Sequence, residues 1–179
     1  MSAAARRWGW HQLDFSWAER FVAEAEVRPG ELVLDVGAGH GVVTGALVAV
    51  GAHVVAVELH PERAAHLRRR FPRAVIVVEA DAADLRLPRR PFRVVANPPY
   101  AITSPLLRRL LQPGSRLLAA DLVLQRQAAQ RWASPSAPGY RRWSQRFEAQ
   151  LGLRIPRSAF QPRARVDHAV LRIRCFRRQ

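Results

Sequence analysis

The sequence predicts a single α/β domain built on a doubly wound, mainly parallel β-sheet with an antiparallel edge. Short apolar runs alternate along the chain with segments of helical pattern, as in βαβ units. A glycine-rich turn stands between the first of these runs and the helix that follows it. The length of 179 residues suits one domain with a substantial core. In such a sheet, ligands bind at the carboxyl ends of the strands.

The first half of the chain predicts a βαβ unit followed by one more helix and strand. Pro29 and Gly30 mark a turn before the first strand. Pro61 can occupy the first turn of a helix, where its missing N–H would have no partner in any case. We expect, in order, a helix over 17–25, a strand over 32–36, a helix over 42–50, a strand over 54–57, a helix over 61–71 and a strand over 75–78.

The second half continues the alternation and then changes character. Pro113 and Gly114 form a turn, and the sequence SPSAPG over 134–139 is a loop by composition. The last two apolar runs favour an antiparallel pair that closes the sheet edge. We expect a strand over 94–96, a helix over 104–111, a strand over 117–124, a helix over 125–132, and strands over 150–155 and 169–175.

The charge of the chain predicts a polyanionic partner. Twenty-nine basic residues, all of them arginine, stand against 14 acidic ones, which gives a formal net charge of +15. Arginine presents a planar fork that suits phosphates and stacks on bases. A nucleic acid is therefore the expected partner.

Metal, redox and membrane functions are disfavoured. The single cysteine, Cys175, excludes an internal disulfide and a cysteine-clustered zinc site. The histidines show no ligand spacing and are interpreted as surface or packing residues, except that His11 lies in a segment that can fold over a cofactor. They are His11, His40, His53, His60, His66 and His168. The N-terminus has no apolar signal segment, so we expect a cytoplasmic protein without a membrane partner.

The glycine-rich turn predicts a nucleotide-like cofactor. Gly37, Gly39 and Gly41 let the backbone approach a ligand closely. Their spacing differs from the dinucleotide fingerprint and Asp35 precedes the first glycine, which favours S-adenosylmethionine over NAD. Glu58 ends the second strand, where an acid can accept hydrogen bonds from ribose hydroxyls.

A carboxylate at the end of the third strand completes this set. Asp81 can accept a hydrogen bond from the exocyclic amine of the cofactor adenine, whereas Asp84 is interpreted as a solvated loop acid.

The segment Asn97-Pro98-Pro99-Tyr100 is the most informative motif. The amine of adenine is a poor nucleophile because its lone pair is delocalised into the ring. The side-chain carbonyl of Asn97 and the backbone carbonyl of Pro98 can accept its hydrogens and favour a more tetrahedral nitrogen. The prolines fix this turn, and Tyr100 offers a face for a base taken out of its helix. Direct in-line methyl transfer then needs no metal and no covalent intermediate.

Taken together, these residues resemble the rRNA adenine N6-methyltransferases, and most closely their erythromycin-resistance branch. The matching segments cover nearly the whole chain in order. They are DVGAGHGVVT (35–44), AVELHP (56–61), EADAADLRLP (79–88), NPPYAITSPLLRRLL (97–111), LVLQRQAAQRW (122–132) and FQPRARVDHAVLRI (160–173).

The resemblance implies a Rossmann-like class I methyltransferase fold, S-adenosylmethionine as donor and an adenine of 23S rRNA as target. By position, Gly37 and Gly39 would lie along the methionine portion, Glu58 would hold the ribose and Asp81 would read the adenine. Asn97 and Tyr100 would form the catalytic pocket.

Two departures from the family pattern affect these expectations. Trp10-His11-Gln12-Leu13 replaces the usual Gln-Asn-Phe-Leu-like segment, so His11 and Leu13 would be the matching cofactor contacts. We also expect no counterpart of the family's helical C-terminal domain, as in the short mycobacterial-type members that the chain resembles. We therefore divide the chain into an N-terminal Arg/Trp-rich segment with a helix (1–30) and the methyltransferase domain (31–179). RNA contacts would come from Arg6, Arg7, Trp8 and Trp10 and from the cluster over 140–146.

The expected function is N6-methylation of an adenine in 23S rRNA by a monomer, conferring resistance to macrolide-type antibiotics. One alternative is the sister family that dimethylates adenines of small-subunit rRNA, although those enzymes usually have Gly-Pro-Gly where this chain has Gly37-Ala38-Gly39. Another is a non-catalytic RNA-binding protein of ribosome assembly. Whether one or two methyl groups are added depends on room in the pocket, which the sequence leaves open.

Overall fold

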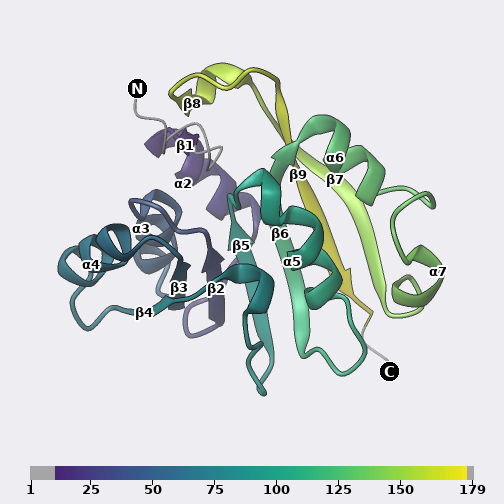
Figure 1. Cartoon of the computed structure of the whole chain (residues 1–179), viewed down its shortest axis with the longest axis horizontal. Coiled ribbons are helices and arrows are strands. Elements are labelled where there is room, and N and C mark those ends of the chain that lie inside the picture. The colour runs from purple at the N-terminus through teal and green to yellow at the C-terminus, as the bar shows by residue number, and fades with distance from the viewer. Residues whose placement is uncertain (1–10, 177–179) are drawn as a thin grey trace.

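The structure is a computed structural model and describes residues 11–176 (Figure 1). Arg6, Arg7, Trp8 and Trp10, which the sequence assigns to RNA binding, lie outside the described residues.

Helices and strands alternate along the chain as the sequence predicts. The strands are β1 (Gln12–Leu13), β2 (Leu32–Val36), β3 (His53–Glu58), β4 (Val75–Glu79), β5 (Phe92–Ala96), β6 (Leu117–Gln125), β7 (Phe147–Ile155), β8 (Phe160–Gln161) and β9 (His168–Cys175). The α-helices are α2 (Phe15–Glu24), α3 (Val42–Ala49), α4 (Pro61–Arg70), α5 (Thr103–Leu110), α6 (Arg126–Trp132) and α7 (Tyr140–Trp143). Short 3-10 helices include η1 (Ala82–Asp84) and η2 (Tyr100–Ile102).

Seven of these strands form one sheet in the order β4-β3-β2-β5-β6-β9-β7. The five strands from β4 to β6 pair in parallel, whereas β9 is antiparallel to both of its neighbours. The predicted fold class is therefore confirmed: a doubly wound, mainly parallel sheet with an antiparallel edge.

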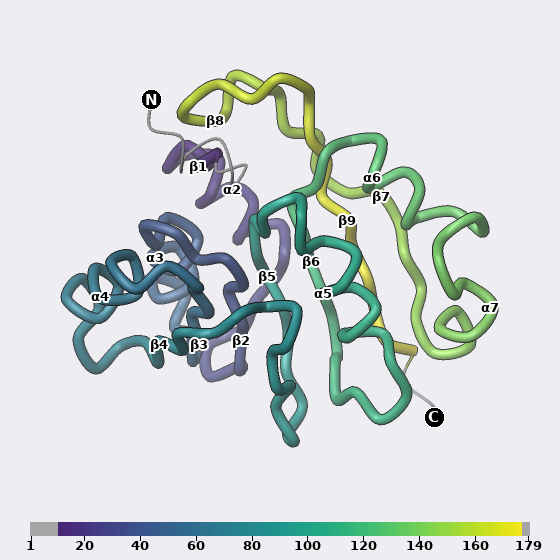
Figure 2. Tube along the Cα trace, viewed as in Figure 1, coloured from purple at the N-terminus to yellow at the C-terminus, as the bar shows by residue number. Residues whose placement is uncertain are grey.

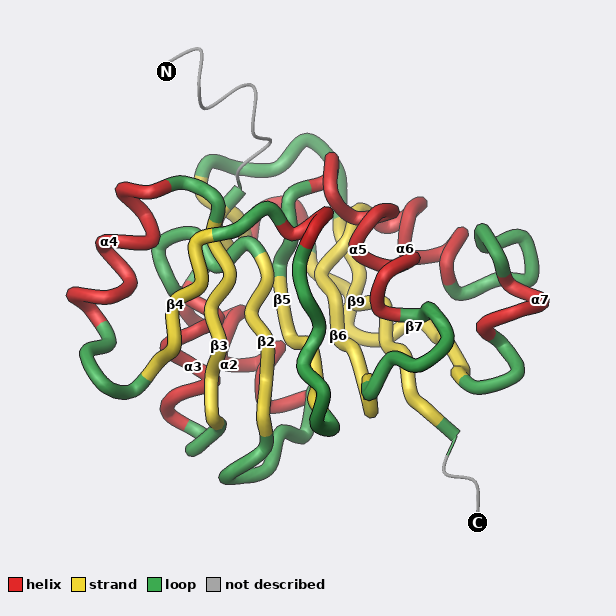
Figure 3. The backbone as a smooth tube through the Cα atoms, turned by 60° about the horizontal axis from the view of Figure 1, so that its bottom comes forward, coloured by secondary structure: helices red, strands yellow, loops and turns green. Residues whose placement is uncertain are grey.

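Helices lie on both faces of the sheet (Figure 3), and alternate residues of the central strands pack toward opposite faces. Leu34 and Val94 pack in the cluster that contains α5 and α6, while Val33 and Val95 pack with α2 and α3. Both faces of the central strands are covered, which explains why these strands are mostly apolar rather than alternating.

A small two-stranded sheet joins two distant parts of the chain. β1 pairs antiparallel with β8, so that Gln12 lies opposite Gln161 and Leu13 opposite Phe160. Figure 2 shows these two segments side by side. The sequence does not predict this pair because two residues are too few to show a period.

The strand β7 begins at Phe147, three residues before its predicted start. The missed residues alternate between buried Phe147, exposed Glu148 and half-buried Ala149. This is the pattern of a strand with one solvated face. The strand also contains a register shift between Leu151 and Arg154, which interrupts the simple alternation.

Candidate active site

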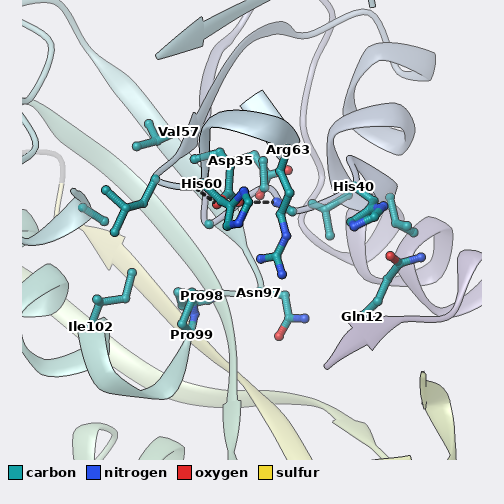
Figure 4. Close-up of a pocket in the computed structure, with 18 of the residues that line it drawn as sticks. Gln12, Asp35, His40, Val57, His60, Arg63, Asn97, Pro98, Pro99 and Ile102 are labelled. Atoms are coloured by element: carbon teal, nitrogen blue, oxygen red, sulfur yellow. Dashed lines mark hydrogen bonds between the residues drawn. The ribbon is translucent and has the colours of Figure 1, made fainter. Parts of the chain in front are cut away.

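A cavity of about 290 Å³ lies at the carboxyl ends of the central parallel strands (Figure 4). Its walls come from the glycine-rich turn, the end of β3, the segment after β4, the turn after β5 and the short strand β1. The structure brings every site residue predicted from the sequence into this one lining. They are His11, Leu13, Gly37, Gly39, Glu58, Asp81, Asn97, Pro98 and Tyr100.

The glycine-rich turn follows β2 and leads into α3. Gly37 and Gly39 have positive φ angles of 75° and 58°, which L side chains rarely adopt. Gly37 also lies directly against Pro99, with no room for a side chain between the two turns. The turn therefore presents bare backbone to the cavity.

Glu58 braces this turn from the end of β3. Its Oε2 accepts a hydrogen bond of 2.8 Å from the Gly39 N–H, and its Oε1 accepts one of 2.9 Å from the His60 N–H. Each carboxylate oxygen has a second lone pair, so these bonds still leave acceptors for a ligand hydroxyl. Glu58 is buried and lines the cavity. Its bracing role was not predicted from the sequence.

Asp35 is a buried acid at the floor of the same cavity. Its Oδ2 accepts a hydrogen bond of 2.6 Å from the Thr44 hydroxyl. Burial raises the pKa of Asp35 to about 7, against the lowering effect of the Thr44 hydrogen bond, and the nearby Glu58 charge adds to the rise. From the sequence, Asp35 was considered only as the residue that precedes the glycine-rich turn, and neither its burial nor its contact with Thr44 was predicted.

Asp81 lies two residues beyond the end of β4 rather than at it. Its Oδ1 accepts a hydrogen bond of 2.8 Å from the Ala83 N–H and so caps η1. Because the carboxylate has a second oxygen, Asp81 can cap this helix and still accept a hydrogen bond from a ligand.

The side chain of Asn97 is held from outside its own turn. Its Nδ2 donates a hydrogen bond of 3.0 Å to the main-chain oxygen of His11. A carbonyl oxygen can only accept, so the amide nitrogen must face His11 and the amide oxygen is directed elsewhere. His11 in turn makes a 2.9 Å hydrogen bond between Nδ1 and the Pro162 oxygen.

Tyr100 is anchored by a residue to which the sequence gave no role in the site. Its hydroxyl and Nε2 of His168 are 2.6 Å apart in a hydrogen bond. His168 is only 1% exposed, and burial lowers its pKa to about 4. The two residues are 68 positions apart in the sequence, so no local pattern could have indicated their contact.

The arginines of α7 lie far from the cavity. β7 starts with Phe147 opposite Cys175, at the end of β9 away from His168, and α7 directly precedes β7. Arg141 and Arg142 are exposed on this helix. The end of the sheet at which they lie is separated from the site by the length of β9, which has eight residues and spans roughly 25 Å.

Within 11–176, no group of three or more histidine, cysteine, aspartate or glutamate side chains is placed to share a metal ion. Along the same part of the chain, no helix combines the length and apolar character needed to cross a membrane.

Comparison with known proteins identifies the relatives of this chain. The family model described as ribosomal RNA adenine dimethylase matches residues 13–178. The "Ribosomal RNA small subunit methyltransferase A" of Methylibium petroleiphilum is 34% identical over 183 residues, covering 97% of this chain and 72% of that protein. An "rRNA methyltransferase" of Streptomyces thermotolerans is 37% identical over 171 residues, covering 90% of this chain and 55% of that protein.

The chain thus spans between about half and three quarters of the length of these two relatives. Among solved structures, the 23S rRNA methyltransferase ErmE superposes with a TM-score of 0.82 and is 28% identical, covering 92% of this chain and 69% of that one. The glycopeptide N-methyltransferase MtfA complexed with S-adenosyl-L-methionine shares the fold, with a TM-score of 0.57 and 17% identity.

The cavity fits the cofactor that this fold carries. Gly37 and Gly39 line the cavity without side chains, and Glu58 and Asp81 supply acceptors at two separate points of the lining. The protein is thus an S-adenosylmethionine-dependent methyltransferase. The erythromycin-resistance branch suggested by the sequence is not singled out by these relatives. With 13–178 matched by the family model and the fold and cavity in agreement, the chain belongs to the ribosomal RNA adenine dimethylase family.

Proposed function

We propose that this protein transfers a methyl group from S-adenosylmethionine to the N6 amine of an adenine in ribosomal RNA. The observation that carries the proposal is the fixed amide of Asn97. Its nitrogen is held by the His11 carbonyl, which leaves its oxygen as an acceptor in a cavity that also contains the glycine-rich turn.

The cofactor residues are assigned by their chemistry and position. Gly37 and Gly39 accommodate the methionine portion, Glu58 accepts from the ribose hydroxyls and Asp81 accepts from the adenine amine. His11 and Leu13 close the cavity from β1. When bound, the cofactor supplies a methyl group on a positively charged sulfonium.

The target amine is activated by acceptors of the chain. The Asn97 side-chain oxygen and the Pro98 main-chain oxygen accept the two amine hydrogens, which favours a lone pair directed out of the ring plane. Pro98 and Pro99 hold these acceptors in place, so no reorganisation is needed at the moment of transfer. Tyr100 stacks against the displaced base.

Small-subunit rRNA is the favoured substrate. The Methylibium petroleiphilum relative is named as a small-subunit methyltransferase, and it aligns with 97% of this chain. This favours the sister-family alternative over the 23S substrate first expected from the sequence.

The 23S rRNA remains a second candidate for two specific reasons. The solved 23S rRNA methyltransferase ErmE superposes with a TM-score of 0.82. The chain also has Gly37-Ala38-Gly39 rather than the Gly-Pro-Gly that is usual in the small-subunit enzymes. In this case the modification would confer resistance to macrolides.

Mass spectrometry of rRNA from both subunits, in cells with and without the protein, tests the proposal. The expected result is one methylated adenine nucleotide that depends on the protein and is lost in cells carrying Asn97→Ala. The subunit in which it occurs decides between the two substrates, and its mass gives the number of methyl groups. If neither rRNA changes while the protein still binds both S-adenosylmethionine and rRNA, the non-catalytic assembly role takes its place.

A further inference from the structure

We propose that His168 is a positioning residue that fixes the ring of Tyr100 for stacking on the target base. The inference deepens the proposed function and rests on it. His168 lies in the last described strand, whereas the glycine-rich turn, Glu58, Asp81 and the Asn97-Pro98-Pro99-Tyr100 turn all lie between 35 and 100.

The contact between the two side chains is close and directional. The Tyr100 hydroxyl and His168 Nε2 are 2.6 Å apart, and the two rings lie nearly parallel, with centroids 5.6 Å apart and an interplanar angle of 26°. The His168 ring also packs against Phe160, with centroids 4.4 Å apart. The imidazole is therefore fixed by packing as well as by the hydrogen bond.

The protonation of both groups suits a stable neutral hydrogen bond. Burial raises the pKa of the Tyr100 phenol, which therefore keeps its proton at neutral pH. Burial lowers the pKa of His168 to about 4, so the imidazole is neutral and offers one acceptor nitrogen. Both the phenol of Tyr100 and the imidazole of His168 therefore stay neutral around neutral pH, so their hydrogen bond does not depend on pH there.

Tyr100 needs such an anchor because its own backbone gives little support. It begins η2, a single turn of three residues, and its side chain is only partly buried. His168 instead begins β9, which is hydrogen-bonded to strands on both sides. The bond thus connects the free end of a cavity-wall ring to the rigid part of the sheet.

His168 acts through Tyr100 rather than on the cofactor. Among the described residues, those lining the cavity include Tyr100 and His11 but not His168. The His11 ring also lies near Tyr100, with centroids 6.2 Å apart. Loss of the His168 imidazole should therefore disturb the target-base side of the cavity and leave the cofactor side intact.

The first test measures the ring directly. The chain has two tyrosines, so ring-labelled tyrosine gives two sets of NMR signals, and Tyr140 serves as an internal reference. His168→Ala should shift the Tyr100 signals and speed the flipping of its ring, while the Tyr140 signals stay in place. His168→Gln, which can still hydrogen-bond the phenol, should restore slower flipping. Unchanged Tyr100 signals in a folded His168→Ala protein would overturn the anchoring.

The second test measures its catalytic consequence by a double-mutant cycle. Single-turnover methylation of the rRNA that the mass-spectrometry experiment identifies is compared for Tyr100→Phe, His168→Ala and the combined variant. Each single change should slow transfer about two- to tenfold. The combined variant should be no slower than the slower of the two single variants, because both changes remove the same hydrogen bond. Affinity for S-adenosylmethionine should be unchanged. His53→Ala, at an exposed position at the start of β3, is the matched control.

Losses that multiply in the combined variant would show that the two residues act separately and would exclude the positioning role. If the parent protein methylates neither rRNA, the proposed function fails and the catalytic consequence fails with it. The tyrosine spectra then decide the anchoring by themselves.

Discussion

A methyl group added at Gly37 would lie 2.6 Å from Cδ of Pro99, closer than packed carbon atoms approach one another. Gly37 belongs to the glycine-rich turn, and Pro99 belongs to the turn that we propose holds the target amine. The two motifs, 60 residues apart in the sequence, thus touch without an intervening side chain. The proline ring has little freedom to move away.

Gly37→Ala should therefore damage both halves of the site. The new methyl group displaces Pro98 and Pro99, so we expect a loss of S-adenosylmethionine affinity together with at least a tenfold loss of transfer rate, on the order of that caused by small misplacement of reacting groups. Calorimetric titration with S-adenosylmethionine and single-turnover assays measure the two effects.

Gly114→Ala is the matched control for backbone strain. Gly114 has a φ of 81°, similar to the 75° of Gly37, but no heavy atom lies within 4 Å of an added Cβ there. Both variants should lose about 1–2 kcal/mol of stability from the left-handed conformation. Cofactor affinity should fall only in Gly37→Ala, and an equal fall in both would assign the effect to strain instead.

Asn97→Ala should abolish methyl transfer while S-adenosylmethionine binding stays close to that of the parent. The change removes the acceptor for the target amine but leaves the carboxylates of Glu58 and Asp81 in place. Loss of one preorganised polar group of this kind typically costs about 100-fold or more in rate. Stopped-flow or quench measurements on the identified rRNA give the rate. Turnover near the parent level would rule out Asn97 as the group that activates the amine.

Asp35→Asn should stabilise the ligand-free protein increasingly as pH rises from about 4 to 7. Burial raises the pKa of Asp35 to about 7 from 3.8, so over this range the folded state keeps a proton that the unfolded state releases. The contribution of Asp35 to stability is therefore full below about pH 4 and declines until about pH 7. Asparagine stays neutral and can still accept from the Thr44 hydroxyl.

Urea unfolding of parent and variant at a series of pH values measures this difference. Each unit of pKa shift corresponds to about 1.4 kcal/mol, so the gap in the free energy of unfolding should exceed the precision of the measurement and level off above pH 7. A gap that stays constant with pH would show that Asp35 does not titrate in this range.

Neutralising Arg163 and Arg165 together should weaken rRNA binding more than neutralising Arg141 and Arg142. Arg163 and Arg165 are exposed in the segment that contributes the Pro162 contact to His11 and leads into His168, whereas the other pair lies on α7 at the opposite end of the sheet. The first double variant should lower the salt dependence of binding by roughly one to two units, at about 0.7 per phosphate contact on single strands.

The α7 pair is thus the matched comparison for the same number of charges. Filter binding of the rRNA across a salt titration measures both variants, with S-adenosylmethionine affinity as the check on folding. A larger effect from Arg141 and Arg142 would place the main RNA contacts at the far end of the sheet, as the sequence alone suggested.

The local parts of the fold and site are predictable because their signals are local. β2 and β3 are short and rich in apolar residues, and Glu58 is the last residue of β3. The glycine-rich turn and the Asn97-Pro98-Pro99-Tyr100 turn are recognisable because glycines and prolines mark them in the sequence. By contrast, the pairing of Gln12 with Gln161 and the contact of Tyr100 with His168 join segments far apart in the sequence. Such contacts depend on how the sheet closes, which no window of the sequence records.

The position of β9 in the sheet sets the order in which the molecule can be completed. β6 and β7 are synthesised before β9, yet until His168–Cys175 is available β6 can pair only with β5, and β7 lacks its one neighbour in the described sheet. Until then each strand presents an open edge to other chains. His168 arrives with the same strand and brings the hydrogen bond that holds Tyr100. The strand that joins β6 to β7 is therefore also the strand that supplies the contact to Tyr100.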